Sequence, residues 1–424
     1  MTKVKEGGKK AAFHIAGDLI WSIAALVIFN GAVQLFIYPS FKKQMGAEEF
    51  GVALFYIALI SLVASTFGTA ANYSRMVQST TGHDRNADYN IYLIICVAVC
   101  VPIAFVMIPM KGLSVTGAAL LFLLLAFSIL RYYDDVQFRL TVNFKGYFVY
   151  YVIITAGYCL GLLAYRFTGE WMATILVGEV LATVFVLIRG HIFKPPFLKK
   201  SEFFSETSRS VWILTAAQLI PAIVLNADRL LLEPMHGGEA NTTYYIASLV
   251  GKTVAILTVP IDGVLLGYLA KWEGKFTKKL FAVFTVGMLA MGAVFTLACW
   301  GGSYVFVYLF YREELANVSR YFLIANAGQI FFFVSNTLMV VVLRFAAEKY
   351  QTYINIIYAL IFAAAVPFVT YKYGVLGFSV SVLAVNAIKF AVVAAVGFSR
   401  LKKPDAPEQV GESISEEGED AENG

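Results

Sequence analysis

The sequence predicts an all-α polytopic membrane protein with twelve transmembrane helices arranged as two six-helix lobes. The first observation is composition: of 424 residues, 59% are hydrophobic and 14% are charged, which is more apolar surface than the core of a soluble protein could bury. The second is that apolar runs of about 20 residues, enough to cross about 30 Å of hydrocarbon, recur from end to end. The third is a similarity between the two halves. We expect helices, because a helix satisfies its own backbone polar groups in lipid.

Twelve apolar runs define the predicted spans. The basic N-terminal segment MTKVKEGGKKAAFHIAGD leads into the first run without a small-residue cleavage pattern, so we interpret this run as a retained helix rather than a signal peptide. The predicted spans cover residues 18–41, 50–74, 90–110, 114–133, 147–166, 170–190, 210–233, 243–269, 278–300, 319–343, 350–370 and 375–399.

The positions of lysine and arginine predict the orientation. If the N-terminus is cytoplasmic, the inside segments hold 23 of the 33 lysine and arginine residues and the outside segments hold 8, while Lys252 and Lys389 fall within spans. Cytoplasmic segments of membrane proteins carry the excess of positive charge, so both termini are predicted to be cytoplasmic. One missed or extra span would invert every later loop, so the bias also supports the count of twelve.

Two polar segments indicate the domain organisation. The stretch IRGHIFKPPFLKKSEFFSETSRS is the longest polar interruption and separates six spans from six. The tail after Lys403 carries eight acidic residues and no basic one, which is typical of a disordered, solvated segment. We predict a cytoplasmic N-terminus (1–17), an N-lobe (18–190), a cytoplasmic linker (191–209), a C-lobe (210–400) and a disordered acidic tail (401–424).

The two halves contain similar segments at corresponding places. GAEEFGVALFYIALI (46–60), which opens the second span, has a counterpart in GGEANTTYYIASLV (237–250), which opens the eighth. YRFTGEWMATILVGEV (165–180) corresponds to YKYGVLGFSVSVLAV (371–385) in the same way. Since each half has an even number of spans, the repeat is parallel, with a pseudo-two-fold axis along the membrane normal. Such repeats typically bind substrate between two lobes that rock about a central cavity.

Ionisable residues inside spans are candidate functional residues, because a charge in the bilayer is costly unless it faces a cavity or a partner. Asp228 and Arg229 lie near the outer end of the seventh span. They are candidates for the cavity mouth, with Asp228 also a candidate for ion coupling. An interfacial pair that joins this span to a neighbour is an equally open alternative.

Three further charged residues lie deeper in the predicted bilayer. Lys252 is close to the midplane in the eighth span, where it can reach neither interface, and Asp262 follows Pro260 on the inner part of that span. Lys389 is midway along the twelfth span, one turn after Asn386. A structural pairing of Lys389 with Glu179 of the sixth span, itself a candidate for ion coupling, stays open beside a substrate role.

Uncharged polar residues form stripes at helical spacing in both lobes. Each stripe alone is more typical of hydrogen bonding between helices than of ligand binding, but together with Arg75 they favour a hydrophilic central cavity. The stripes are Asn30, Gln34 and Tyr38 on the first span, Ser65, Thr69 and Asn72 on the second, and Asn326, Gln329 and Asn336 on the tenth.

The charges predict the chemistry of the ligand. Cations such as Lys252, Arg229 and Arg75 in a water-filled cavity suit a phosphate or a diphosphate, whereas a cavity for drug cations would be expected to carry unpaired carboxylates. The four cysteines lie within spans without metal-ligand spacing, and no Gly-rich phosphate loop followed by Lys-Ser/Thr is present. We therefore expect no metal site, no cofactor and no nucleic-acid partner.

Several segments resemble the bacterial polysaccharide flippases of the Wzx type. The run ADRLLLEPMHGGEANTTYYIASLVGKTVAILTVPIDGVLLGYLAKW (227–272) is similar to their seventh and eighth spans. YPSFKKQMGAEEFG (38–51) resembles their first outer loop, FRLTVNFKGYFVYYVIITAGYCLGLLAY (138–165) their fifth span, and GVLGFSVSVLAV (374–385) the opening of their last. The resemblance covers about residues 17–400 and specifies the superfamily, which includes multidrug (MATE-like) exporters and the lipid II flippase, better than the subfamily.

This resemblance implies a function and a location. It implies that the chain moves a polyprenyl-diphosphate-linked oligosaccharide to the outer leaflet of the bacterial cytoplasmic membrane by alternating access, beside a polysaccharide polymerase and glycosyltransferases. It would place Asp228, Arg229, Arg75 and Lys252 around the head-group cavity. The chain lacks the spans beyond twelve and the arginine-rich cavity of the lipid II flippase, which makes a peptidoglycan precursor a weaker prediction.

Two other classes of function stay open. A multidrug exporter of the same fold predicts a cavity dominated by acidic residues, which Lys252 and Lys389 argue against. A membrane glycosyltransferase or polymerase would need a sizeable outer loop with a carboxylate or histidine site. The predicted outer loops are short, and the four histidines lie without carboxylates in a matching pattern, so we do not expect an enzyme.

Overall fold

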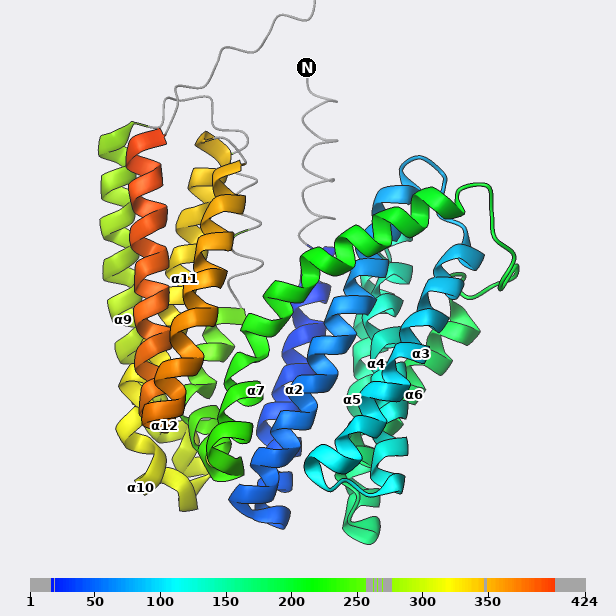
Figure 1. Ribbon diagram of the computed structural model, residues 1–424, viewed down its shortest axis with the longest axis horizontal. Helices are drawn as coiled ribbons and strands as arrows, with labels where there is room; N and C mark the ends of the chain where they lie inside the picture. Colours follow the sequence, from blue (N-terminus) through cyan, green and yellow to red (C-terminus); the bar gives the residue numbers. More distant parts are fainter. Residues whose placement is uncertain are drawn as a thin grey trace, which may run out of the picture. The chain divides into compact units, whose positions relative to one another are not determined.

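The structure is a computed structural model that describes residues 17–18, 20–256, 262, 265, 269, 277–346 and 349–400. All the regular elements in this part of the chain are helices (Figure 1). Residues 1–16 of the predicted N-terminal segment, the acidic tail 401–424 and most of the inner part of the predicted eighth span lie outside the described residues. The elements are η1 (Val33–Ile37, a π-helix), α2 (Tyr38–Ser79), α3 (Asn86–Lys111), α4 (Val115–Leu140), α5 (Phe144–Thr168), α6 (Trp171–Arg189), α7 (Phe204–Ile256), α9 (Lys278–Phe310), η2 (Arg312–Glu314), α10 (Leu315–Val318), η3 (Ser319–Tyr321), α11 (Phe322–Phe345) and α12 (Lys349–Arg400).

Nine helical stretches among the described residues are long and apolar enough to cross a membrane. Three of them have 60, 52 and 52 residues, or about 80–90 Å at about 1.5 Å per residue, far more than one crossing needs. Each is interrupted by a glycine with non-helical backbone angles: Gly46, Gly237 and Gly374. Dividing each stretch at its glycine gives twelve segments, the number predicted from the sequence. The number of membrane crossings itself stays a prediction.

The turns at Gly46 and Gly237 have the same backbone conformation. Their φ and ψ angles are 82° and −179° at Gly46 and 84° and 175° at Gly237, a region that glycine adopts far more readily than other residues. These are the turns that open the predicted second and eighth spans, so their agreement is what the internal repeat predicts. At the second predicted pair, Gly169 and Gly374, φ is positive at both but ψ differs, 1° against −137°.

Helix α4 is longer than the predicted fourth span and corrects one assignment. The span was predicted to end at residue 133, which placed Arg139 in a cytoplasmic segment, and Arg131 near the end of the span was counted with the cytoplasmic lysine and arginine residues. The helix continues to Leu140 and buries Asp134 completely. The polar run RYYDD ends the apolar pattern but does not end the helix. Tyrosine hydroxyls of α5 donate hydrogen bonds to its aspartates, and Glu179 of α6 pairs with its arginine, as described below.

The chain forms two compact units. The first contains residues 1–245 with Phe310–Arg312, and the second contains 246–309 with 313–424. The boundary in α7 therefore lies at Tyr245, whereas the lobes were predicted to separate at 191–209. Side-chain hydrogen bonds tie the start of α7 to the first unit: Ser74 Oγ donates to Ser210 Oγ at 3.0 Å, and Tyr92 Oη lies 2.8 Å from Thr215 Oγ1. The predicted lobe boundaries stay a prediction.

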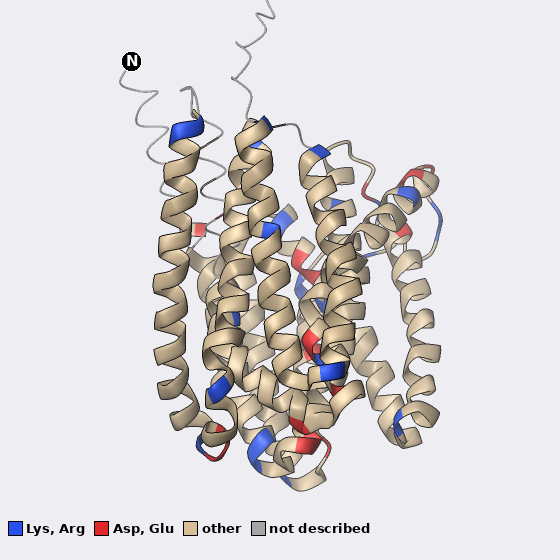
Figure 2. Cartoon of the chain, turned by 60° about the vertical axis from the view of Figure 1, so that its left-hand side comes forward, with Lys and Arg blue, Asp and Glu red and all other residues tan. Residues whose placement is uncertain are grey.

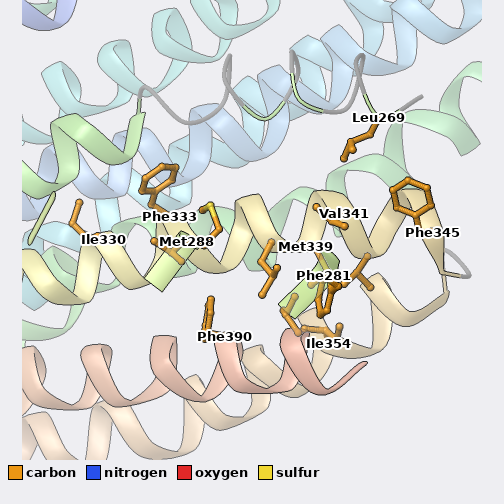
Figure 3. Packing of buried hydrophobic residues seen from close by; sticks show 14 of the residues in the cluster. Leu269, Phe281, Met288, Ile330, Phe333, Met339, Val341, Phe345, Ile354 and Phe390 are labelled. Atoms are coloured by element: carbon orange, nitrogen blue, oxygen red, sulfur yellow. The ribbon is translucent and has the colours of Figure 1, made fainter. Parts of the chain in front are cut away.

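The second unit has an apolar core between α9, α11 and α12 (Figure 3). Its buried side chains include Phe281 and Met288 from α9, Phe333 from α11 and Phe390 from α12. In a bilayer, such a core is stabilised by close van der Waals packing between helices rather than by removal of apolar surface from water.

Large apolar side chains also cover the outside of both units. On α9 they include Val283, Val286 and Val294, each more than 60% exposed. Most of the chain is free of lysine, arginine, aspartate and glutamate residues, which appear at helix ends and at a smaller number of places along the helices (Figure 2). Such a surface is stable in hydrocarbon and not in water, so the fold is that of a multi-pass membrane protein. Cys159 is exposed on this surface, whereas Cys96, Cys100 and Cys299 are buried.

Candidate functional site

The turns at Gly46 and Gly237 interlock within the first unit. The Glu48 carboxylate accepts hydrogen bonds from the backbone N–H groups of Gly238 (2.9 Å) and Glu239 (2.7 Å), which are donors at the start of a helical segment. Asn241 Nδ2 in turn donates to the Gly51 carbonyl at 2.7 Å. The backbones approach so closely that a Cβ atom on Gly51 would lie 1.8 Å from the Gly238 carbonyl oxygen.

Asp228 and Arg229 lie two turns before this junction and form a local ion pair. Arg229 Nε is 3.6 Å from Asp228 Oδ1, and Arg229 Nη2 donates to Asn226 Oδ1 at 2.8 Å. Both side chains are largely buried, with 6% of Asp228 and 17% of Arg229 exposed. The geometry shows that the two charges compensate each other, and it leaves both sequence-based alternatives, cavity mouth and interfacial pair, open.

A second ion pair beside it was not predicted. Lys111 at the end of α3 contacts Glu233 of α7 at 2.5 Å, and its ammonium group lies 4.9 Å from the Phe55 ring centroid. Only 7% of the Glu233 side chain is exposed. The sequence analysis placed Glu233 at the end of the seventh span and did not consider it as a partner for Lys111. Its position one helical turn after Arg229, on the same face of the helix, marked it as a further charged residue of that face.

Arg75 and Asn72 make structural contacts at the end of α2. Arg75 donates to the Tyr133 hydroxyl and the Asn86 carboxamide oxygen, and its Nε lies 3.7 Å from Asp84. Asn72 Nδ2 donates to the Tyr132 carbonyl at 3.2 Å. These partners join α2 to α4 and to the loop after α2, and the role of both residues in a ligand cavity stays a prediction.

The polar stripe on the first span makes two kinds of contact. Asn30 Nδ2 donates to the Leu26 carbonyl of its own helix at 2.9 Å. Gln34 Oε1 accepts from the hydroxyl of Tyr245, the tyrosine of the repeated Tyr-Ile-Ala triplet. Asn30 and Gln34 are both half-buried, so neither is sealed from a ligand.

A charged cluster in the middle of the first unit is the largest feature that the sequence analysis missed. Arg131 Nε donates to both carboxylate oxygens of Glu179, at 2.9 and 2.8 Å, and the Tyr158 hydroxyl donates to Glu179 at 2.7 Å. The Glu179 side chain is only 1% exposed. Glu179 is thus occupied by Arg131 rather than by Lys389, the partner that we had considered.

Two more carboxylates extend this cluster along α4. Tyr150 donates to Asp134 at 3.4 Å, and Tyr147 and Tyr151 donate to Asp135 at 3.4 and 3.5 Å. Asp134 Oδ1 is buried and has no hydrogen-bond partner among the described residues. The tyrosines recur at helical spacing on the predicted fifth span, and this spacing was the signal that could have revealed the cluster.

Lys389 is the most deeply buried lysine described in the second unit. It is 6% exposed, and its Nζ donates to Asn336 Oδ1 at 2.7 Å. The ammonium group also lies 4.8 Å and 4.6 Å from the ring centroids of Phe332 and Tyr358, which is favourable cation–π geometry. These partners are neutral, so Lys389 carries a net positive charge into the helix bundle. The adjoining cavity has a volume of about 10 Å³, room for about one water.

The other polar residues of the second unit are distributed among helix contacts. Thr337 Oγ1 donates to Asp262 at 2.7 Å, and Lys252 is half-buried. Asn326 Nδ2 donates to the Ala247 carbonyl at 3.1 Å and its Oδ1 accepts from Gly251 N at 2.6 Å. Asn326 therefore joins α11 to the end of α7. This is the hydrogen bonding between helices that we considered for its polar stripe as the alternative to ligand binding. The described residues contain no cluster of three or more His, Cys, Asp or Glu side chains able to hold a metal ion.

Comparisons with known proteins identify the fold. No protein-family model and no curated protein matches this chain. The structure titled "Lipid II flippase MurJ, inward closed conformation" is similar with a TM-score of 0.70 and 14% identity, covering 88% of this chain and 86% of that one. An inward-facing multidrug resistance MATE family transporter of the MOP superfamily has a TM-score of 0.60 at 12% identity, covering 89% and 97%.

A third similar structure, from Pyrococcus furiosus, is titled as a MOP superfamily transporter whose reverse polarity of binding pocket suggests a different function. It has a TM-score of 0.54 at 15% identity and covers 92% of this chain and 94% of that one. At these identities the likeness establishes the fold and not the substrate. The chain is a multi-pass membrane protein with the fold of the MOP-superfamily transporters, which confirms the coarser fold prediction.

Proposed function

We propose that this protein is a flippase that moves a polyprenyl-diphosphate-linked oligosaccharide across the bacterial cytoplasmic membrane by alternating access. The observation that carries the proposal is the fold shared with a lipid II flippase over 88% of the chain, at a TM-score of 0.70 against 0.60 for the MATE transporter. The Wzx-type resemblance of 227–272 supports a polysaccharide precursor as the cargo, with a polymerase and glycosyltransferases as partners.

Buried cations support an anionic cargo. Lys389 is a cation in the middle of a helix, and the described partners of its ammonium group are all neutral. A diphosphate that reaches it forms charge-assisted hydrogen bonds and loses less of its solvation energy than it would in hydrocarbon. In the present conformation the cavity beside Lys389 is too small for a diphosphate, so the two parts of α12 that line it, 354–361 and 385–392, must move apart at that level when the cargo binds. Lys252 and Arg229 are the other proposed contacts.

The membrane potential favours outward movement of an anion. It contributes about 2.3 kcal/mol per charge for each 100 mV, and the cytoplasm is the negative side. Asp228 and Glu179 remain proposed ion-coupling residues. Both are paired with an arginine in the described conformation, so a coupling ion would have to compete with that arginine.

A cation exporter is the second candidate, and the acidic cluster of the first unit favours it. Asp134 and Asp135 lie on α4 and Glu179 lies on the neighbouring α6. Arg139 contacts Asp135 at 4.0 Å and Arg131 contacts Glu179 at 2.8 Å, so three carboxylates share two arginines in this part of the described chain. A multidrug exporter of this fold predicts buried carboxylates, and our sequence analysis had assigned two of these three to a loop. The second candidate is therefore stronger than the sequence alone suggested.

Mass spectrometry of polyprenyl-linked lipids, from cells with and without the gene, separates the two candidates. A flippase predicts that one diphosphate-linked oligosaccharide accumulates in the deletion strain and returns to its normal level when the gene is restored. An unchanged lipid pool together with greater sensitivity to cationic dyes would overturn the flippase proposal in favour of the exporter. A gene that carries Lys389→Met should restore the lipid-linked oligosaccharide to its normal level less well than the unchanged gene does.

A further inference from the structure

The loop between α2 and α3 and the segment between α6 and α7 enclose a pocket on the first unit. Its volume is about 420 Å³, which falls within the range of about 300–1,000 Å³ of small-molecule sites. The lining residues are Asp84, Arg85, Asn86, Ala87, Pro196, Lys199, Lys200 and Ser201. All belong to segments that the charge bias places on the cytoplasmic side, and none is among the candidates for the transport cavity.

The pocket is built by specific contacts between its two segments. Asn86 Nδ2 donates to the carbonyls of His191 and Lys194, both at 2.9 Å. The Asp88 carboxylate accepts from the Ser201 backbone N–H at 3.0 Å and from the Ser201 hydroxyl. The linker segment is therefore fixed on the first turn of α3, and the pocket between them has a defined shape.

Three basic side chains give the pocket a positive charge. Arg85 and Lys200 are held beside aromatic rings, Arg85 at 5.8 Å from the Phe203 centroid and Lys200 at 4.7 Å from the Phe204 centroid. Lys199 is exposed. The acidic lining residue, Asp84, lies 3.7 Å from Arg75 Nε, so its charge is already compensated. The first residues of α3 line the pocket too, and a helix N-terminus adds a partial positive charge.

We infer that this pocket binds a phosphate monoester or diester through Arg85, Lys199 and Lys200. Arginine matches phosphate geometry with two parallel hydrogen bonds, and lysine binds it as a point charge. Two sources can supply this chemistry: the head group of an anionic lipid, or a soluble phosphate compound. The adjacent Phe197 and Leu198 are 55% and 59% exposed, and apolar side chains beside a basic cluster are typical of a segment that lies on an anionic membrane surface.

The test is isothermal titration calorimetry on the full-length protein in a nonionic detergent. The probes are dioctanoyl phosphatidic acid as the lipid phosphate, glycerol 3-phosphate as its soluble counterpart and dioctanoyl phosphatidylcholine as the neutral lipid. We expect phosphatidic acid to bind and phosphatidylcholine not to bind. The triple variant Arg85→Gln, Lys199→Gln, Lys200→Gln should bind about 100-fold more weakly, since each surface cation contributes about fivefold.

Two further variants separate the possible outcomes. The triple variant Lys145→Gln, Lys278→Gln, Lys279→Gln removes the same charge from exposed positions outside the pocket and should bind as the unchanged protein does. Phe197→Ser with Leu198→Ser should weaken phosphatidic acid only. Equal binding of glycerol 3-phosphate, unaffected by that double variant, would support the site with a soluble ligand. Full affinity in the first triple variant, equal loss in the control triple variant, or no binding of either phosphate probe would overturn the inference.

Discussion

At the scale of single residues, a variant of Lys389 tests whether a buried cation contacts the ligand or only packs between helices. Its burial among Phe332, Tyr358 and Asn336 leaves no carboxylate that would be stranded if the lysine were replaced. We therefore expect Lys389→Met to keep the protein folded and to lower transport about tenfold or more, because a hydrogen bond to a charged group contributes about 1.5–3 kcal/mol. Accumulation of the lipid-linked intermediate, measured against protein level, gives the result.

The matched control for Lys389 is Lys372→Met. Lys372 lies 4.7 Å from the Phe368 ring centroid, the same kind of cation–aromatic contact, but its side chain is exposed. Transport should be unchanged in this variant. Normal transport in both variants would show that the buried cation does not bind the cargo.

The Arg131–Glu179 pair predicts a strong and asymmetric effect on stability. Glu179→Leu leaves Arg131 without its carboxylate in a buried site, which costs about 3–5 kcal/mol. The double variant Arg131→Met, Glu179→Leu removes both charges and should recover most of that loss. Thermal unfolding in detergent measures both effects. Additive losses in the double variant would contradict the pairing.

A surface pair provides the reference for this cycle. His83 Nδ1 lies 3.2 Å from Glu206, whose side chain is 56% exposed. Such pairs contribute about 0–1 kcal/mol, so Glu206→Leu should change the unfolding temperature little. The contrast between the two glutamates tests burial rather than charge alone.

At the scale of elements, the junction of the two glycine turns fixes the backbone. We expect Gly51→Ala to destabilise the protein by about 3 kcal/mol, the upper end of the usual cost of overpacking, because the new methyl group would overlap the Gly238 carbonyl. The yield of monodisperse protein and its unfolding temperature report the change. Gly31→Ala is the control, since no heavy atom outside its own helix lies within 4 Å. If the two variants behave alike, the close approach of the backbones is not a constraint.

The extent to which the elements could be predicted depends on where polar residues fall. Apolar length located the helices, since every predicted span within the described residues lies in a helix. The pattern failed in α4, where Arg131, Asp134 and Asp135 look like a loop in sequence. A single sequence cannot show that α5 and α6 supply tyrosines and a carboxylate to these charges. The same limit applies to Glu179, whose true partner was a residue we had placed outside the bilayer.

At the scale of the whole molecule, the sequence predicted which residues are costly in lipid but not which of them face a ligand. The described partners of Lys389 are neutral, whereas Tyr133, Asn86 and Asp84 bind the guanidinium of Arg75. The predicted ligand role of each residue stays a prediction. The two side chains are equally buried, so burial does not distinguish them. Their partners differ, and these partners are brought together only by the tertiary structure. The multi-pass helical fold followed from composition and apolar length, which a sequence shows directly, whereas the twelve spans and the two-lobe repeat stay predictions.

The predicted topology can be tested with single cysteines introduced into a cysteine-free variant. Twelve crossings with both termini in the cytoplasm put the turns at Gly46, Gly237 and Gly374 outside, because each of these glycines would then join an outward to an inward span. Lys43→Cys and Lys372→Cys should therefore react with a membrane-impermeant maleimide in intact spheroplasts, while Lys145→Cys and Lys278→Cys should react only after the membrane is made permeable. All four positions have exposed side chains, so access to the reagent depends on the side of the membrane. Labelling of both Lys43→Cys and Lys145→Cys in sealed cells, or protection of both, would reject the count of twelve, because three predicted crossings separate the two positions. The opposite pattern at all four positions would keep the count and reverse the orientation.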